Sequence, residues 1–355
     1  MDRAAYRRKR QQEEAAKKRA QEHRELARFY NLNSMLGNNW AIFYFIIGAR
    51  DTGKSYSVTD FFCRQKKKLG DQCKNYWLRI SDKSVKALLI NKADKLVDPD
   101  LKRKYKLELS VKGQQVFDHK KEFMHVAPLS SFGKEKGVGF FDKDFTGWYN
   151  IALDEFQLET GEKRTTFDIL YAFTQMCETY VRTEKKHVRI FLLGNTLEES
   201  STVLKAFNFM PEKLGRYYLH SKRCVIDNLE VTEAYKLDRK GSVADILAGT
   251  SSNYTNELIQ GKKQIFQGRL NHPTALIKFT KDPNSWFTVF DGKIIRRYRG
   301  EGVRNVIAMR PYLDELYVRE KYINVLDMYD ARAFYFDCLV SEAYFTGELV
   351  KLRTK

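Results

Sequence analysis

The stretch that decides the fold runs from Trp40 to Ser55 and reads WAIFYFIIGARDTGKS. Its first half is aromatic and apolar without alternation, which is typical of a strand buried on both faces of a sheet. Its second half, from Gly48 to Ser55, matches the phosphate-binding pattern G-x-x-x-x-G-K-[ST] in full. The amphipathic segment YSVTDFFCRQKKKLG follows directly. Strand, glycine loop and helix in this order favour a phosphate-binding loop over a glycine turn with an incidental lysine.

Such a loop lets backbone N–H groups turn toward phosphates, and the N-terminus of the next helix adds its positive end. Lys54 is expected to reach the β- and γ-phosphates, and the Ser55 hydroxyl to ligate Mg²⁺. The residues expected to contact the nucleotide are Gly48, Ala49, Arg50, Asp51, Thr52, Gly53, Lys54, Ser55 and Tyr56. The sequence therefore predicts a site for a nucleoside triphosphate and Mg²⁺.

Two adjacent acids close a second apolar strand, WYNIALDEF at residues 148–156. A magnesium-holding acid is expected where a neighbouring buried strand ends. We expect Asp154 to hold Mg²⁺ through water and Glu155 to orient and polarise the attacking water as general base. Capping of the strand end is the plainer alternative. The adjacency matters because a switch GTPase does not use Glu in that place.

A third apolar strand, VRIFLLGNT at residues 188–196, carries Asn195 near its end. We expect Asn195 to sense the γ-phosphate or the lytic water, although satisfying a turn is an equally simple role. Arg182 lies in the basic turn at 180–186, where it could enter a neighbouring subunit's site or be ordinary solvated charge. The tetrad Asn91-Lys-Ala-Asp94 resembles the guanine-reading N-K-x-D, but it precedes Asp154, so we interpret it as coincidence.

Composition sets the class of protein. The chain has 355 residues, 43% of them hydrophobic, so it can bury a sizeable core. Its net charge of +18 indicates an anionic partner, most often nucleic acid. Five cysteines without metal-like or paired spacing argue for a reducing cytosol. The apolar run Trp40 to Ala49 is about half as long as a bilayer requires, so no membrane partner is expected.

The chain divides by pattern into four parts. Residues 1–38 are predicted to form a basic helical N-terminal extension, with ten Lys/Arg against five Asp/Glu in the first 28 residues, and a solvated, partly helical tail is the plainer alternative. Residues 39–229 alternate apolar strands with helical patterns and predict an α/β domain with a mostly parallel sheet. Residues 230–260 contain the linker-like LAGTSSNYTNEL. Residues 261–355 predict a smaller α+β domain of short strands followed by helix.

In this order the motifs resemble the DNA-packaging ATPases of small tailed phages of the phi-29 type. The resemblance covers about 200 residues and rests on FYN and ML at 29–36, IIGARDTGKSY, YWLRIS, APLSSFGKEK, LDEF and YVRTEKKHVRIFLLGN. It implies a P-loop ATPase of the additional-strand (ASCE) class that binds ATP and Mg²⁺ and drives double-stranded DNA into a procapsid. It also implies an RNase H-like C-terminal domain; since phages of this type package unit-length genomes, we expect no nuclease activity there.

The resemblance assigns roles to further residues. Arg182 falls on the trans-acting arginine, Lys136 near the subunit interface, and Arg79 on the arginine after the second strand. Asp51 places a negative charge where a small residue is expected. The implied partners are a homomeric ring, taken as a pentamer, the phage portal and procapsid, and structural RNA as a further candidate. The implied location is the host cytoplasm, with transient docking on the procapsid.

Several basic residues are candidates for gripping DNA phosphates without reading sequence. They are Lys120, Lys121, Lys134 and Lys136, while Lys293, Arg296, Arg297 and Arg299 could face DNA, RNA or the portal. For each of them, plain solubilising charge is the alternative. In the C-terminal domain Asp282, Asp291, Asp330 and Asp337 do not stand in apolar strands beside a second acid, as a two-metal nuclease requires.

The sequence is also compatible with two rival functions. One is another P-loop enzyme, a helicase or a nucleotide-dependent nuclease. The other is a non-catalytic nucleic-acid-binding structural protein, against which the intact Lys54, Ser55, Asp154 and Glu155 argue.

Overall fold

The computed structural model describes residues 29–134, 145–157, 167–181, 187–195, 201–211, 214–242, 265–266, 268–298, 302–309 and 316–353. The chain divides into two compact units. The first unit comprises Met1–Leu197 and Lys213–Ile259, and the second comprises Glu198–Glu212 and Gln260–Lys355. Residues 201–211, which the sequence pattern groups with the first domain, thus belong to the same unit as the C-terminal part of the chain.

The first unit is built on one large sheet, and its described residues supply nine strands in the order β3-β4-β5-β2-β6-β7-β1-β9-β8. The strands are β1 (Phe43–Ile47), β2 (Cys73–Arg79), β3 (Leu109–Lys112), β4 (Gln115–Asp118), β5 (Lys121–Pro128), β6 (Trp148–Asp154), β7 (Val188–Gly194), β8 (Gly215–Leu219) and β9 (Cys224–Asn228). In this order, six consecutive strands pair in parallel: β5, β2, β6, β7, β1 and β9. At one end β4 pairs antiparallel with β5 and with β3, and at the other end β8 pairs antiparallel with β9. The predicted mostly parallel α/β sheet is confirmed.

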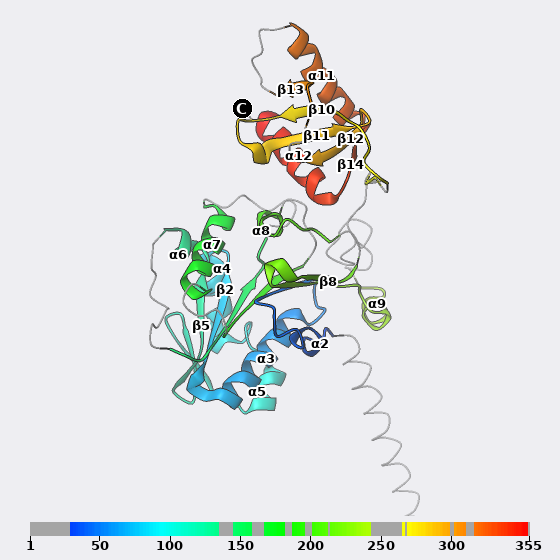
Figure 1. Ribbon diagram of the computed structural model, residues 1–355. Coiled ribbons are helices and arrows are strands. Elements are labelled where there is room, and N and C mark those ends of the chain that lie inside the picture. The colour runs from blue at the N-terminus through cyan, green and yellow to red at the C-terminus, as the bar shows by residue number, and fades with distance from the viewer. Residues whose placement is uncertain are drawn as a thin grey trace, which may run out of the picture. The chain divides into compact units, whose positions relative to one another are not determined.

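Helices cover both faces of this sheet. They are α2 (Asn33–Leu36), α3 (Lys54–Leu69), α4 (Asp82–Ala93), α5 (Pro99–Tyr105), α6 (Ser130–Lys134), α7 (Ile169–Val181) and α9 (Glu233–Arg239), with 3₁₀ turns η1 (Gly70–Gln72) and η2 (His220–Lys222). Because side chains alternate along a strand, Tyr44 and Ile46 of β1 join the core under α3, while Phe43 meets Phe173 of α7. Figure 1 shows α3 and α5 on one side of the strands and α6 and α7 on the other.

Local signals set where the helices begin. Gly53 adopts φ +81°, a left-handed conformation that suits glycine, and α3 starts at the next residue. Ser81 and Ser84 form a capping box at the start of α4. Asp98 caps α5.

The strand order brings the predicted site residues to one edge of the sheet. β7 lies between β6 and β1, so one strand separates the acids from the loop. Since these strands are parallel, their carboxyl ends meet at the same edge. Gly48, Arg79, Asp154 and Asn195 therefore all stand at that edge, at or just beyond the ends of β1, β2, β6 and β7.

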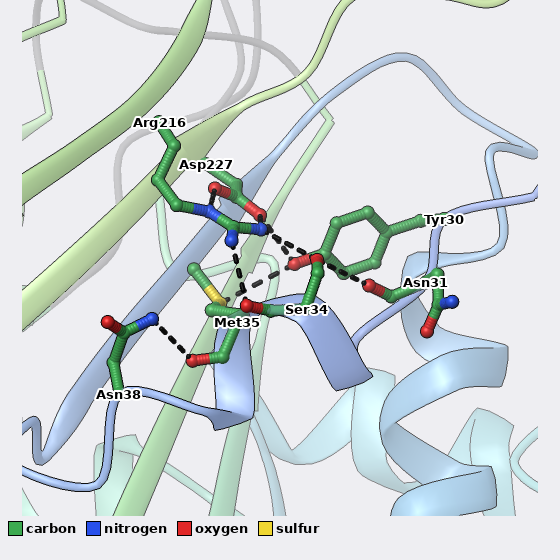
Figure 2. A network of polar contacts seen from close by, with 7 residues as sticks. All are labelled: Tyr30, Asn31, Ser34, Met35, Asn38, Arg216 and Asp227. Atoms are coloured by element: carbon green, nitrogen blue, oxygen red, sulfur yellow. Dashed lines mark hydrogen bonds and ion pairs between the residues drawn. The ribbon is translucent and has the colours of Figure 1, made fainter.

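A polar network binds the segment 29–38, which we call the N-terminal strap, to β8 and β9 at the other end of the strand order (Figure 2). Arg216 of β8 binds both carboxylate oxygens of Asp227 of β9, at 2.5 and 2.7 Å. The Tyr30 hydroxyl donates to the same carboxylate at 2.7 Å, and Arg216 also donates to the backbone oxygen and hydroxyl of Ser34, both at 2.8 Å. The strap also donates from Tyr30 N to Thr52 O at 2.8 Å, which joins it to the glycine loop.

The second unit contains a five-stranded mixed sheet in the part of it that the structure describes, in the order β13-β10-β11-β12-β14. Its elements are α8 (Thr202–Ala206), β10 (Pro273–Lys278), η4 (Pro283–Ser285), β11 (Trp286–Phe290), β12 (Ile294–Arg297), β13 (Val306–Ala308), α11 (Leu316–Asp330), β14 (Tyr335–Phe336) and α12 (Leu339–Arg353). Its core centres on Phe345, whose ring meets those of Phe279, Phe287 and Phe336. Within the described ranges, no helix is long and apolar enough to cross a bilayer.

Segment 201–211 is bound into this unit by polar contacts. The Arg297 guanidinium stacks on Tyr344 at 3.3 Å and donates to Asn208 at 3.2 Å. Lys205 of α8 donates to Ala343 O at 3.2 Å. Arg297 is only 8% exposed, so the expectation that it faces DNA, RNA or the portal is wrong: its charge serves the interior of the unit. Arg299 lies outside the described residues.

Candidate nucleotide site

The glycine loop is closely packed between β1 and α3. Gly48 N donates to Gly194 O at 3.1 Å, which ties the loop to β7. A Cβ at Gly48 would meet Leu229 at 2.9 Å, and one at Gly53 would meet Phe29 of the N-terminal strap at the same distance. Close approach therefore favours glycine at both positions of the motif, and at Gly53 the left-handed backbone conformation does so as well.

Lys54 is folded back onto the loop that precedes it. Its Nζ donates to Gly48 O at 2.8 Å and Ala49 O at 2.7 Å, and the side chain is buried. The Thr52 hydroxyl also donates to Ala49 O, at 2.8 Å. The ammonium group is thus held under the loop by carbonyl oxygens, close to where a phosphate would lie.

Arg79 binds both acids at the end of β6. Its guanidinium lies 2.9 Å from Asp154 and also contacts the Glu155 carboxylate. Burial raises the pKa of Asp154 above its ordinary value, Arg79 acts to lower it, and the neighbouring charge of Glu155 raises it again. Glu155 adopts φ +57°, a left-handed conformation that is uncommon for residues other than glycine. Asp154 is buried, whereas the side chain of Glu155 is 45% exposed and open to a reactant.

A cavity of about 500 Å³ joins these groups. Its walls are Arg50, Asp51, Gly53, Lys54, Ser55, Tyr56, Thr59, Arg79, Asp94, Lys95, Leu96, Asp98, Asp154, Glu155 and Asn195. Gly48, Ala49 and Thr52 stand behind it as the hydrogen-bond partners of Lys54. The loop, the two acids and Asn195, which the sequence placed on three separate strands, therefore share one cavity.

Sequence reasoning missed the stretch 94–98, which forms one wall of this cavity. Backbone φ is positive at Asn91, Lys92 and Ala93, and this left-handed run leads the chain from α4 to that wall. Asp94 also forms an ion pair with Lys102. The only local signal was the Asn91–Asp94 tetrad, which we interpreted as coincidence.

The donor set of the cavity fits a hard divalent cation. Mg²⁺ takes oxygen ligands and is usually held by one or two protein groups together with phosphate oxygens and water. Ser55 and Asp154 line the same cavity and supply a hydroxyl and a carboxylate. No cluster of three or more His, Cys, Asp or Glu side chains that could hold a metal occurs in the described ranges.

Lys120 and Lys121, which the sequence offered for gripping DNA, do not line this cavity. Lys120 and Lys121 lie where β5 begins, which is the edge of the sheet opposite to the carboxyl ends of β2 and β6. Lys134 is the last residue of α6, and its side chain is not described. Arg182 and Lys136 lie outside the described residues. The roles of all five stay predictions.

Comparison with known proteins places this geometry in context. A family model described as podovirus DNA encapsidation protein (Gp16) matches residues 25–290, which include every described wall residue of the cavity. No curated protein sequence matches the chain.

Two solved phage motors share the fold. The bacteriophage Phi-29 viral genome packaging motor assembly aligns with a TM-score of 0.64 and 20% identity, over 92% of this chain and 100% of that one. The Phi-28 gp11 DNA packaging motor aligns with a TM-score of 0.59 and 14% identity, over 91% and 98%.

Proposed function

The chain belongs to the podovirus DNA encapsidation protein family, and from this premise we propose that it packages the phage genome by hydrolysing ATP at the cavity under the glycine loop. Genome packaging follows from the family. Hydrolysis is supported by one observation above all, the meeting of Lys54, Ser55, Asp154 and Glu155 around a cavity of about 500 Å³. The position of β7 between β6 and β1 supports the additional-strand P-loop class.

Each group has a role that its position allows. Lys54 would leave the Gly48 and Ala49 carbonyls and bind the β- and γ-phosphates. Ser55 and Asp154 would hold Mg²⁺, which when bound neutralises charge on the phosphate oxygens. Asn195, at the end of the strand between loop and acids, would contact the γ-phosphate or the attacking water.

Glu155 would act as the general base. It is exposed to the cavity and contacts Arg79, which holds it in place and engages its carboxylate. Hydrolysis would therefore require Arg79 to release Glu155 at least in part. Because Arg79 also binds the buried Asp154, the same movement would free the metal-holding acid.

We further propose that the working form is a homomeric ring, taken as a pentamer, around double-stranded DNA on the phage portal and procapsid, with structural RNA as a candidate partner. The net charge of +18 supports a polyanionic partner. Arg182 is assigned to the neighbouring subunit's site, and the ring would act in the host cytoplasm.

For the second unit we propose an RNase H-like domain that does not cleave DNA. Its acids are engaged separately: Asp330 pairs with Arg353 at 2.7 Å, and Asp337 with Arg296 at 3.5 Å. Asp282 accepts from Asn284 N at 2.9 Å in the η4 turn. Incubation of the full chain with duplex DNA and Mn²⁺ should give no cleavage products.

The test of hydrolysis is DNA-dependent ATPase of the full chain. Wild type should turn over ATP in the presence of Mg²⁺, and Lys54→Ala and Glu155→Gln should each lose about 10²-fold or more. Glu108→Gln, a change of the same kind at an exposed position of the same unit, is the matched control and should keep full activity. Equal turnover by wild type and Glu155→Gln would support a binding protein instead, and strand separation would support a helicase.

Mixing variants tests the shared site. Arg182→Ala and Glu155→Ala subunits should each be inactive alone and should recover part of the activity together, because one subunit supplies the base and the other the arginine. No recovery would count against the trans role of Arg182.

A further inference from the structure

Asp51 is an unusual residue for the tip of a phosphate-binding loop. It adopts φ +61°, a left-handed conformation that most residues avoid. Its side chain is 67% exposed and lines the cavity together with Lys54 and Ser55. A carboxylate in this place faces the position where the triphosphate would lie, and like charges repel.

The structure pairs this carboxylate with α9, a helix far along the chain. Arg239 Nη1 donates to Asp51 at 2.8 Å, although the two residues are 188 positions apart. The same guanidinium nitrogen donates to the Tyr235 hydroxyl at 2.9 Å, and that hydroxyl donates to Arg50 O at 2.8 Å. α9 therefore holds the loop tip by one charged and one neutral contact.

These contacts rest on a rigid base. Tyr235 is fully buried and packs with Ala49 of the loop and Val231 before α9. The Arg239 side chain is only 19% exposed and lies over the Tyr235 ring, 5.3 Å from its centre. An ion pair in which one partner is largely covered is less screened by water than a fully exposed pair.

We propose that Arg239 is a positioning residue for nucleotide binding, which neutralises Asp51 and thereby allows a triphosphate to enter a loop that carries a negative charge. The inference rests on the proposed function, since it concerns the same cavity. Arg239 acts through Asp51. Without Arg239 the Asp51 carboxylate would be left facing the phosphates, and binding would weaken.

The test is equilibrium binding of a fluorescent ATP analogue with Mg²⁺ to the full chain at low salt. Arg239→Gln should weaken binding about tenfold, as expected for an uncompensated like charge at the edge of a phosphate site. Asp51→Asn in the Arg239→Gln background should restore binding to near the wild-type level. Raising the salt concentration should shrink the loss in the single variant.

A matched control tests whether the effect belongs to the Asp51–Arg239 pair or follows from the loss of any positive charge on α9. Lys236→Gln removes one positive charge from the same helix, where Lys236 pairs with Glu233 at 2.9 Å, and it should bind the analogue like wild type. Circular dichroism and urea unfolding should confirm that each variant is folded. Rescue by Asp51→Asn is the decisive readout, because a merely structural loss at α9 would not be repaired by a change in the loop.

The outcomes distinguish failure of the proposed function from failure of the role proposed for Arg239. If wild type does not bind the analogue, or Lys54→Ala binds as well as wild type, the proposed function fails. If wild type binds and Lys54→Ala does not, but Arg239→Gln binds like wild type or stays weak in the double variant, only the role of Arg239 is overturned.

Discussion

Two arginine–aspartate pairs join neighbouring strands of the same sheet and have different surroundings. Arg79 of β2 binds Asp154 of β6, and Arg216 of β8 binds Asp227 of β9. The burial of the two pairs is similar: the aspartate side chains are 10% and 5% exposed, and the arginines 17% and 25%. Strand pairing and burial alone therefore do not tell which pair takes part in chemistry.

The surroundings of the pairs make the difference. Asp227 also accepts from Tyr30, and Arg216 also donates to Ser34, so the N-terminal strap covers this pair. The pair at Arg79 instead borders a cavity, and its guanidinium is shared with the second acid, Glu155. Loss of one partner from the covered pair would leave a buried charge without compensation, whereas a pair on a cavity can exchange its partners for a ligand.

Glu155→Gln should give the largest effect, and it tests whether the acids beside the cavity, unlike the covered pair, take part in hydrolysis. Loss of the general base should lower ATP turnover about 10³-fold, within the usual range for acid–base catalysis. The matched variant Asp227→Asn should lower stability and leave turnover per folded molecule unchanged. Steady-state ATPase corrected for the folded fraction checks both, and turnover lost equally in the two variants would remove the distinction.

Arg216→Ala should give the largest loss of stability. It leaves the buried Asp227 without its bidentate partner, and we expect the free energy of unfolding to fall by about 3 kcal/mol. Lys222→Ala, an exposed cation on η2, should change it by less than about 0.5 kcal/mol. Urea unfolding measures both; a loss below 1 kcal/mol for Arg216→Ala would show that the strap is not held by this pair.

Arg79→Ala should shift a pH profile. In the folded chain the pKa of Asp154 is raised, chiefly by burial, and Arg79 acts to lower it. Because the pKa of Asp154 is higher in the folded chain than in the unfolded one, the folded state gains stability at pH values below the unfolded pKa, and this gain is lost as the pH rises through the folded pKa. Binding of Mg²⁺ needs the ionised form of Asp154. Affinity for the ATP analogue with Mg²⁺ should therefore fall on acidification.

Removing Arg79 takes away an interaction that lowers this pKa, so the acid limb of the affinity profile should move to higher pH. Titrations of the analogue in buffers of decreasing pH give the limb for wild type and variant. An unmoved limb would show that Arg79 does not control the ionisation of Asp154.

Tyr30→Phe should give the smallest effect. It removes one hydrogen bond to a charged acceptor while keeping the ring, so we expect a loss of about 1.5 kcal/mol. Tyr171→Phe, at an exposed position of α7, is the control and should lose less than about 0.5 kcal/mol. Urea unfolding compares them, and equal losses would mean that the Tyr30 hydroxyl adds nothing to the network in Figure 2.

The sequence alone determined the loop, the strand before it and the helix after it, together with the acids at the end of β6. These features depend on short-range preferences: glycine at φ +81° before α3, apolar strands buried on both faces, and polar residues where a strand ends. Such preferences act within a few residues of the chain, so they can be read without knowing its path. The parallel sheet followed from them, because parallel strands need helical crossovers.

Only the tertiary structure decided which distant residues meet. Asp51 finds Arg239 188 positions away, and Tyr30 finds Asp227 197 positions away. Tertiary structure also decided that Arg297 is buried and that segment 201–211 packs with the second unit. The reason is physical: a charged side chain pairs with whatever the order of strands and the packing of helices bring to it, and no local preference encodes that order.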